Sequence, residues 1–223
     1  MGFDSAWEKI HASRSWGKYP NEYVVSFMMS TFGNCLNRQD IKVLDLGFGG
    51  GGNLWFLVKE GFDAYGIDGS PSALKKTEIF LSQNQLQAKI RCGDMTDLSL
   101  FSDKFFDVVI DVRSMSNVPY NEVGLVFGGI NRILKKNGFF MTFLYGKSCN
   151  GYLRGRRLES RTFTDIKEGV FAGVGHVTIY SPKDIRSLFK EFGLKIVNWK
   201  RILQESMDAN DKFEDHVVIA VKK

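Results

Sequence analysis

Glycines gather in one short stretch of this 223-residue chain, between Gly47 and Gly52. A run of β-forming residues precedes the stretch and helix-forming residues follow it, so it joins a predicted strand to the start of a predicted helix. Because glycine has no Cβ and adopts positive φ readily, the backbone there can approach a ligand closely at a helix N-terminus. The pattern predicts a ligand-binding loop, whose contacts we expect to be Gly47, Gly49, Gly51 and Asn53.

Carboxylates follow the predicted strands that come after this loop. Asp68 ends the next strand, where Rossmann-like sheets place an acid that accepts hydrogen bonds from ribose hydroxyls. Asp94 follows the third strand, where it could accept a hydrogen bond from an adenine amino group. Because the carboxyl ends of parallel strands share one edge of a sheet, these acids and their neighbours Gly69 and Met95 predict a nucleoside site.

Two kinds of nucleoside cofactor fit this pattern. Gly47, Gly49 and Gly52 satisfy the GxGxxG spacing of nicotinamide and flavin enzymes, which keeps an NAD-dependent oxidoreductase as an alternative. Asp45, two residues before the first glycine, favours S-adenosylmethionine, because an acid there suits a cationic amino group better than a pyrophosphate. An antiparallel pair of strands predicted at the end of the chain favours the same cofactor.

Short β-rich runs alternate with helical stretches along most of the chain, which is typical of a parallel sheet covered by helices on both faces. The strands are predicted at residues 42–46, 63–67, 89–92, 106–111 and 139–145, and the helices at 51–60, 71–83 and 121–136. Gly138 follows two lysines and is expected to stop the last of these helices. A helix from Ser181 to Phe192 then precedes two strands, at 194–202 and 216–221, which should pair as an antiparallel hairpin.

Two segments lie outside this alternation. Residues 6–31 are predicted to form one or two helices broken at 17–20, and residues 146–175 are rich in glycine and arginine without clear periodicity. We expect both segments to cover the carboxyl edge of the sheet. The chain is therefore predicted to be one α/β domain, 1–223, with a helical cap at 1–40, a cofactor-binding core at 41–145, a substrate-side insertion at 146–180 and a helix with a β-hairpin at 181–223.

The order of these motifs resembles that of the class I S-adenosylmethionine-dependent methyltransferases. The resemblance covers about residues 42–145 and rests on DLGFGGG at 45–51, the acid of GIDGS, GD at 93–94, FDVVID at 106–111 and ILKKNGFF at 133–140. Phe48 and Lys136-Asn137 depart from the family pattern, and neither change affects an expected cofactor contact. The resemblance implies a Rossmann-like sheet of seven mostly parallel strands, S-adenosylmethionine as the cofactor, and methyl transfer in enzyme class EC 2.1.1.

The first residues of the chain also resemble a subgroup of small methyltransferases found with bacterial surface-polysaccharide genes, at residues 7–11 and 16–22. This second resemblance implies methyl transfer to oxygen or nitrogen of a small molecule, with a sugar or a sugar nucleotide as the acceptor. An RNA or protein methyltransferase is the alternative from the same fold. Trp7, Trp16 and Tyr19 could form an aromatic lid near a sulfonium, or a stripe of core residues.

Methyl transfer from a sulfonium requires the nucleophile, the methyl carbon and the sulfur to be in line in a dry pocket, and an oxygen or nitrogen nucleophile can also need a base. The candidate bases are Asp111 at the end of the fourth strand, His176 at the end of the glycine-rich stretch, and His11 on the N-terminal helix. Asp111 is also a candidate cofactor contact, or a cap of the next turn. Arg113 and Tyr145 are candidate orienters of the acceptor.

Basic residues cluster between Arg154 and Arg161, where Glu159 is the only acid. Guanidinium groups match phosphate and carboxylate groups, so Arg156 and Arg157 are predicted to bind an anionic acceptor. A solvated loop is the alternative. A nucleic-acid backbone would also fit this cluster, although no separate RNA-binding domain is recognisable in the sequence.

Composition excludes several classes of protein. With 43% hydrophobic and 25% charged residues and a net charge of +5, the chain is neither disordered nor a coiled coil. No apolar run approaches the roughly 18 residues that span a bilayer. Three widely spaced cysteines predict neither a disulfide framework nor a metal site, so we expect a cytoplasmic protein. We expect it to be a monomer or a homodimer.

Overall fold

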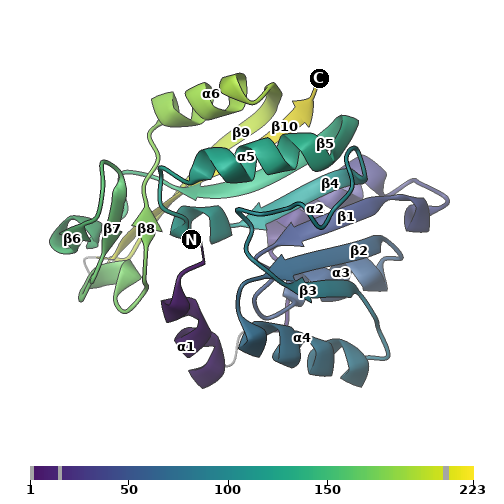
Figure 1. Ribbon diagram of the computed structural model, residues 1–223, viewed down its shortest axis with the longest axis horizontal. Helices are drawn as coiled ribbons and strands as arrows, with labels where there is room; N and C mark the ends of the chain where they lie inside the picture. The colour runs from purple at the N-terminus through teal and green to yellow at the C-terminus, as the bar shows by residue number, and fades with distance from the viewer. Residues whose placement is uncertain (1–2, 15–16, 208–210) are drawn as a thin grey trace.

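The computed structural model describes residues 3–14, 17–207 and 211–223. Its centre is a seven-stranded sheet in the order β3-β2-β1-β4-β5-β10-β9 (Figure 1). Neighbouring strands among β1 to β5 run parallel, and β10 runs antiparallel to both β5 and β9, which confirms the predicted sheet. The strands are β1 (Lys42–Leu46), β2 (Asp63–Asp68), β3 (Lys89–Cys92), β4 (Phe106–Val112), β5 (Leu134–Tyr145), β9 (Leu194–Glu205) and β10 (Lys212–Lys222).

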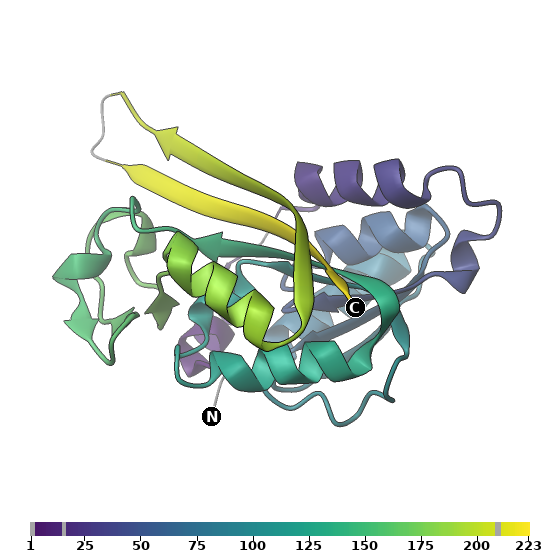
Figure 2. The same ribbon diagram turned by 90° about the horizontal axis from the view of Figure 1, so that it is seen from above.

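Helices cover both faces of this sheet, and two apolar cores hold them there (Figure 2). One core joins Phe127 of α5 and Phe189 of α6 to the sheet, and the other joins Phe27 of α2 and Leu57 of α3 to its opposite face. The α-helices are α1 (Ser5–Ser13), α2 (Glu22–Phe32), α3 (Gly52–Lys59), α4 (Pro71–Gln83), α5 (Val123–Ile133) and α6 (Pro182–Glu191). Short 3-10 helices are η1 (Arg38–Asp40), η2 (Ser114–Asn117), η3 (Tyr152–Arg154) and η4 (Gly169–Phe171).

Helix starts follow the capping residues that the sequence contains. The Ser70 side chain accepts from the backbone N–H of Ala73 at the start of α4, directly before Pro71. At the start of α6, Ser181 and Asp184 form a reciprocal capping box. The predicted break in the N-terminal segment is also confirmed, since α1 and α2 are separate helices.

The boundary between α5 and β5 differs from the prediction. The helix ends at Ile133 and the strand already begins at Leu134, so Gly138 lies inside β5 and stops no helix. Leu134 is fully buried and pairs with Phe106, which draws the chain into the sheet five residues early. Asn137 absorbs the resulting irregularity at a positive φ of 62°.

Residues 146–175, for which no periodicity was found, belong to a small sheet of their own. Its strands are β6 (Arg156–Arg157), β7 (Thr162–Thr164) and β8 (Val177–Thr178), in the order β6-β7-β8. A separate apolar cluster that includes Tyr145, Phe163 and Phe171 supports it. A bridge between Gly146 and Tyr180 fixes this insertion beside the carboxyl end of β5.

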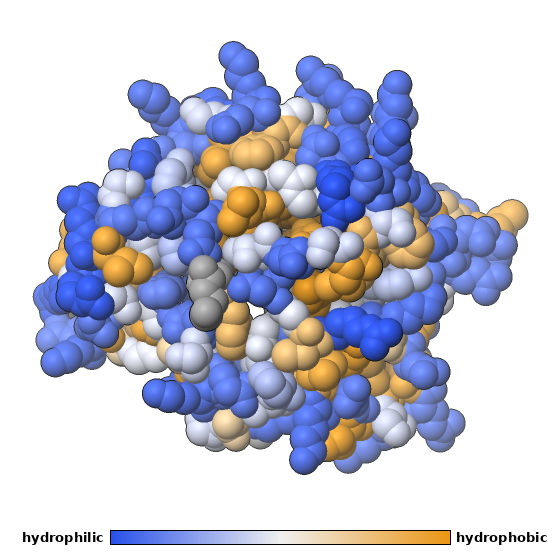
Figure 3. Space-filling model, in the orientation of Figure 1, coloured by the Kyte–Doolittle hydropathy of each residue, from blue (hydrophilic) through white to orange (hydrophobic). Residues whose placement is uncertain are grey.

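The β9–β10 hairpin is longer than predicted and extends beyond the rest of the sheet (Figure 2). Hydrophilic residues cover most of the face seen in Figure 3, and apolar residues gather nearer its middle. Within the described ranges, no helix combines the length and the apolar character needed to cross a bilayer.

Candidate functional site

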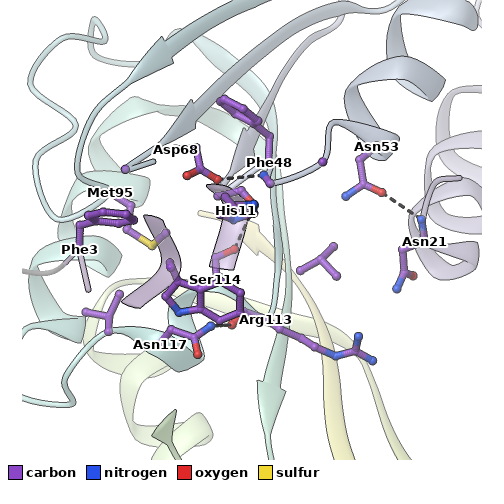
Figure 4. Close-up of a pocket in the computed structure, with 18 of the residues that line it drawn as sticks. Phe3, His11, Asn21, Phe48, Asn53, Asp68, Met95, Arg113, Ser114 and Asn117 are labelled. Carbon is purple, nitrogen blue, oxygen red and sulfur yellow. Dashed lines mark hydrogen bonds between the residues drawn. The ribbon is translucent and has the colours of Figure 1, made fainter. Parts of the chain in front are cut away.

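A cavity of about 560 Å³ lies at the carboxyl edge of the sheet, where β1 to β5 end (Figure 4). The glycine loop, the loops after β2, β3 and β4, and helix α1 all contribute to its walls. This edge is also where the strand order reverses between β1 and β4, the usual ligand-binding position in open α/β sheets.

Gly47 and Gly49 of the glycine loop line the cavity with positive φ angles of 67° and 51°. A Cβ on Gly47 would overlap the Ser114 side chain, so glycine is needed there both for its conformation and for the close approach of the next loop. Gly51 does not line the cavity. It forms the left-handed N-cap of α3, and a Cβ there would meet Thr77.

Asp68 stands at the cavity and joins the glycine loop to the next helix. Its Oδ2 accepts from the backbone N–H of Gly49 at 2.9 Å, and its Oδ1 accepts from that of Ser70 at 2.8 Å. Burial raises the pKa of this carboxyl, whereas the two backbone hydrogen bonds and the nearby His11 oppose that rise. Gly69 also lines the cavity.

Asp94 and Met95 line the end of the cavity beside β3. The Asp94 carboxylate holds its own loop, because Oδ1 accepts from the backbone N–H and the hydroxyl of Thr96 at 2.9 and 2.8 Å. Its Oδ2 accepts from the backbone N–H of Phe3 at 3.0 Å. The Phe3 ring packs closely over Gly69, so the N-terminal segment reaches across this end of the cavity (Figure 4).

Asp45 does not line the cavity, in contrast to the expectation of a direct contact. It is almost fully buried beneath the glycine loop, and Asn53, which does line the cavity, hydrogen-bonds it. Burial and the neighbouring carboxyls of Asp111 and Asp68 raise its pKa well above the usual range. Its Oδ2 is buried with no hydrogen-bond partner among the residues described.

Helix α1 covers the cavity through polar contacts. The Glu8 carboxylate accepts hydrogen bonds from Ser70 and Ser72 at the start of α4. Trp7 and His11 of this helix line the cavity, and burial lowers the pKa of His11, which favours a neutral imidazole. Of the expected aromatic lid, Trp7 and the 86% exposed Tyr19 line the cavity, and Trp16 lies outside the described residues.

Asp111 does not reach the cavity, so the structure does not support it as a base or as a cofactor contact. Its carboxyl is completely buried and does not line the cavity. Oδ1 accepts from the backbone N–H of Met115 at 3.0 Å, and Oδ2 accepts from the Thr142 hydroxyl at 2.5 Å. The group therefore shapes the turn after β4, which is the capping role that the sequence left open.

Arg113 and Tyr145 both line the cavity. Arg113 has a positive φ of 71°, a strained conformation for a residue with a long side chain. Its guanidinium makes two-pronged contact with the buried Asp215 of β10, with Nη2 to Oδ2 at 2.6 Å and Nε to Oδ1 at 3.2 Å. The Tyr145 phenol is buried, which raises its pKa, and the Asn117 amide opposes that rise.

His176 lies outside the cavity lining, so the structure does not support it as a base. Its backbone N–H donates to Asp4 Oδ2 at 2.6 Å, and its Nδ1 is 3.5 Å from the same oxygen. Asp4 also caps α1 and lines the cavity. His176 therefore connects the insertion to the N-terminal helix.

The arginine cluster also lies outside the cavity lining, so the predicted contact of Arg156 and Arg157 with the acceptor has no support from this cavity. Arg156 is exposed and pairs with Asp165 at 2.9 Å, while Arg157 donates to the carbonyl of Ser160. The other two arginines of the cluster pair with acids as well, Arg154 with Glu168 and Arg161 with Asp184. These three acids lie further along the chain than residues 154–161, where Glu159 is the only acid.

Several cavity residues were not found from the sequence. Phe213 comes from β10, and only the tertiary fold brings it to the edge where β4 ends. Asn21 donates its backbone N–H to Asn53 Oδ1 at 3.0 Å, which ties the start of α2 to the glycine loop. Asn117 lies only three residues beyond the Arg113-Ser114 position that the sequence indicated, so the strand end could have led to it.

Comparison with known proteins agrees with this architecture. Residues 43–138 match a family model described as a methyltransferase domain. The uncharacterized methyltransferase YbaJ of Bacillus subtilis is 33% identical to this chain over 102 residues, which is 46% of this chain and 39% of that protein. A ubiquinone biosynthesis O-methyltransferase of Pelagibacter ubique is 25% identical over 115 residues, which is 52% of this chain and 46% of that protein. The matches thus span less than half of either relative.

Among solved structures, a SAM-dependent methyltransferase from Methanosarcina mazei superposes with a TM-score of 0.71 at 21% identity, covering 86% of this chain and 96% of that one. The chain therefore has the Rossmann-like fold of the S-adenosylmethionine-dependent methyltransferases. The match over residues 43–138 and the shared fold support the predicted resemblance of this core to the class I enzymes, for which the motifs indicate S-adenosylmethionine as the cofactor.

Asp111→Asn should flatten the pH dependence of stability. The pKa of Asp111 is raised from 3.8 to about 7 by burial, so between these values the native state keeps a proton that the unfolded state has released. Stability therefore falls as the pH rises through this window, by at most about 4 kcal/mol from this group. Asparagine keeps the shape without titrating. The free energy of unfolding in urea, measured from about pH 4 to about pH 7, should fall less steeply with pH for Asp111→Asn than for the wild type. The same pH dependence in both proteins would contradict the raised pKa of Asp111.

Proposed function

We propose that the protein transfers the methyl group of S-adenosylmethionine to an oxygen or nitrogen of a small-molecule acceptor. The observation that carries this proposal is a single cavity with two different ends. Gly47, Asp68 and Asp94 face one end, and Arg113 and Tyr145 face the other. A volume of about 560 Å³ is in the range of small-ligand sites, which favours a compact acceptor beside the cofactor over a polymer.

The residues present fit the cofactor. Asp68 would hold the ribose hydroxyls, Asp94 the adenine amino group, and Asn53 with Asp45 behind it the cationic amino group. Two observations are consistent with this arrangement: within the described ranges Asp45 Oδ2 has no hydrogen-bond partner, and a Cβ would fill the space beside the glycine loop. When bound, S-adenosylmethionine supplies a methyl group on a sulfonium whose departure leaves a neutral thioether. The chain's contribution is to align the acceptor, exclude water and accept a proton.

His11 is the base that we propose. Of the three candidates from the sequence, it is the one that lines the cavity. Its pKa is lowered by burial, which favours a neutral imidazole that can accept a proton near pH 7. The Asp111 carboxyl accepts hydrogen bonds from Met115 and Thr142, and His176, which does not line the cavity, contacts Asp4.

A sugar-nucleotide acceptor has less support, because Arg156 pairs with Asp165 and both Arg156 and Arg157 lie outside the cavity lining. The same pairing weakens the alternative of an RNA substrate. The printed name of the Pelagibacter ubique relative, a biosynthetic O-methyltransferase, supports a small acceptor with an oxygen nucleophile. Incubation with labelled S-adenosylmethionine and a panel of hydroxylated and amino-bearing small molecules tests the proposal, and transfer to RNA or protein alone would contradict it.

Asp68→Ala should weaken binding of S-adenosylmethionine and of S-adenosylhomocysteine. Losing hydrogen bonds to a charged acceptor should cost about 2–4 kcal/mol of binding free energy, measured by calorimetry. Asp40→Ala removes an exposed carboxylate of η1 outside the cavity and serves as the matched control, with unchanged affinity. Unchanged affinity in a folded Asp68→Ala protein would refute the role of this acid, and tight NADH binding without S-adenosylmethionine binding would refute the proposed function.

Cofactor affinity should rise with pH and then level off. Burial raises the pKa values of Asp45 and Asp68, so both carboxyls are partly protonated at acidic pH, whereas a cationic ligand favours their ionised forms. Calorimetry between about pH 5 and about pH 8 should show this rise with net proton release on binding at the acidic end. Asp45→Asn should bind more weakly and with a smaller pH dependence, and an identical pH profile in that variant would exclude Asp45 as a contributor.

Arg156→Ala combined with Arg157→Ala should leave the kinetics unchanged. Both side chains are exposed and lie outside the cavity lining, so the apparent KM for the acceptor and the cofactor affinity should stay within about twofold of the wild type. Steady-state kinetics at low and at physiological salt check this. A clear rise in the acceptor KM at low salt would restore these arginines to acceptor recognition.

A further inference from the structure

Asn117 lies at the end of the cavity that the cofactor residues leave open. It ends η2, directly after β4, and its side chain lies near Arg113 and Ser114, far from Asn53 and Asn21 in Figure 4. The proposed cofactor acids lie on or after β1, β2 and β3, whereas Asn117 is next to Tyr145 at the end of β5. The sheet order therefore assigns Asn117 to the acceptor end.

The Asn117 amide is held in one orientation with its oxygen unused. Nδ2 donates to the backbone carbonyl of Arg113 at 2.9 Å, which fixes the plane of the amide. Oδ1 is buried and has no hydrogen-bond partner among the described residues, although the side chain lines the cavity. Folded proteins rarely leave a buried acceptor unsatisfied, so this oxygen is suited to a donor that arrives with a ligand.

The walls beside Asn117 are aromatic. The rings of Tyr145 and Phe213 meet edge to face with centroids 5.4 Å apart, and the Arg113 guanidinium lies 4.9 Å from the Phe213 centroid. The charge of Arg113 is balanced by its two-pronged contact with buried Asp215. An apolar ring without charge suits such walls, because a charged ligand would find no unpaired opposite charge there.

We propose that Asn117 recognises the methyl acceptor, and that its Oδ1 accepts a hydrogen bond from a hydroxyl or amino group on an uncharged aromatic ring packed against Tyr145 and Phe213. This inference rests on the proposed function and narrows its acceptor to phenol-like and aniline-like molecules. Asn117 is a binding residue in this arrangement and takes no proton.

Phenol and anisole test the proposal, because they share the ring and differ in the hydroxyl donor. Their affinities can be measured by ligand-observed NMR on the protein saturated with S-adenosylhomocysteine. We expect the wild type to bind phenol about tenfold more tightly than anisole, and Asn117→Leu to reduce this preference to within about twofold. Asn150→Leu is the matched control and should keep the wild-type preference. Asn150 Oδ1 is also buried with no hydrogen-bond partner in the part of the chain that the structure describes, and it lies outside this cavity.

Equal binding of phenol and anisole to the wild type, or no binding of either, would overturn the inference, as would a phenol preference that persists in Asn117→Leu. If that variant does not fold, a crystal structure of the wild type with phenol decides, with the phenol oxygen expected about 2.7 Å from Asn117 Oδ1. Binding of S-adenosylhomocysteine by the same proteins distinguishes a failure of the proposed function from a failure of the proposed role of Asn117. Its absence in the wild type contradicts the proposed function, whereas its presence without a phenol preference contradicts the role of Asn117 alone.

Discussion

The hydrogen bond between the Gly49 N–H and the Asp68 carboxylate is the interaction on which the site depends. It joins the loop after β1 to the end of β2, two strands that pair in parallel over their whole shared length. The loop can reach Asp68 because Gly47 and Gly49 adopt left-handed backbone conformations that bulkier residues rarely take. The hydrogen bond fixes the Asp68 carboxylate and the glycine loop relative to each other at the cavity wall.

Buried carboxyls impose an electrostatic constraint on the same edge. Asp45, Asp68 and Asp111 are all nearly or fully buried, and each has a pKa raised by burial. Asp111 is stabilised by hydrogen bonds within the protein. Asp45 lies behind Asn53, and one of its oxygens has no hydrogen-bond partner among the residues that the structure describes. Of these carboxyls, the one beside Thr142 of β5 already has its hydrogen bonds within the protein, and the one behind Asn53 does not.

Local patterns sufficed to predict what depends on a few neighbouring residues. The glycine loop, the Ser70-Pro71 helix start and the terminal hairpin are each determined by a short stretch, and each was found. The start of β5 was missed because Leu134 follows its tertiary pairing with Phe106 and not the helical propensity of its neighbours. The sequence alone does not show that Arg156 pairs with Asp165. Nor does it show that Asn117 Oδ1 is buried with no hydrogen-bond donor among the described residues.

Polar contacts hold the N-terminal helix at the cavity, whereas apolar burial holds the helices that cover the sheet. Among its residues only His11 is buried, so α1 gains little from the apolar burial that holds α5 and α6 on the sheet. The Glu8 carboxylate of this helix accepts hydrogen bonds from Ser70 and Ser72, and the preceding Phe3 donates its N–H to Asp94. Such contacts exchange readily with water, and each contributes far less than a core side chain. The two apolar cores hold the sheet and its covering helices without α1, so the wall that this helix gives to the cavity depends on its polar contacts.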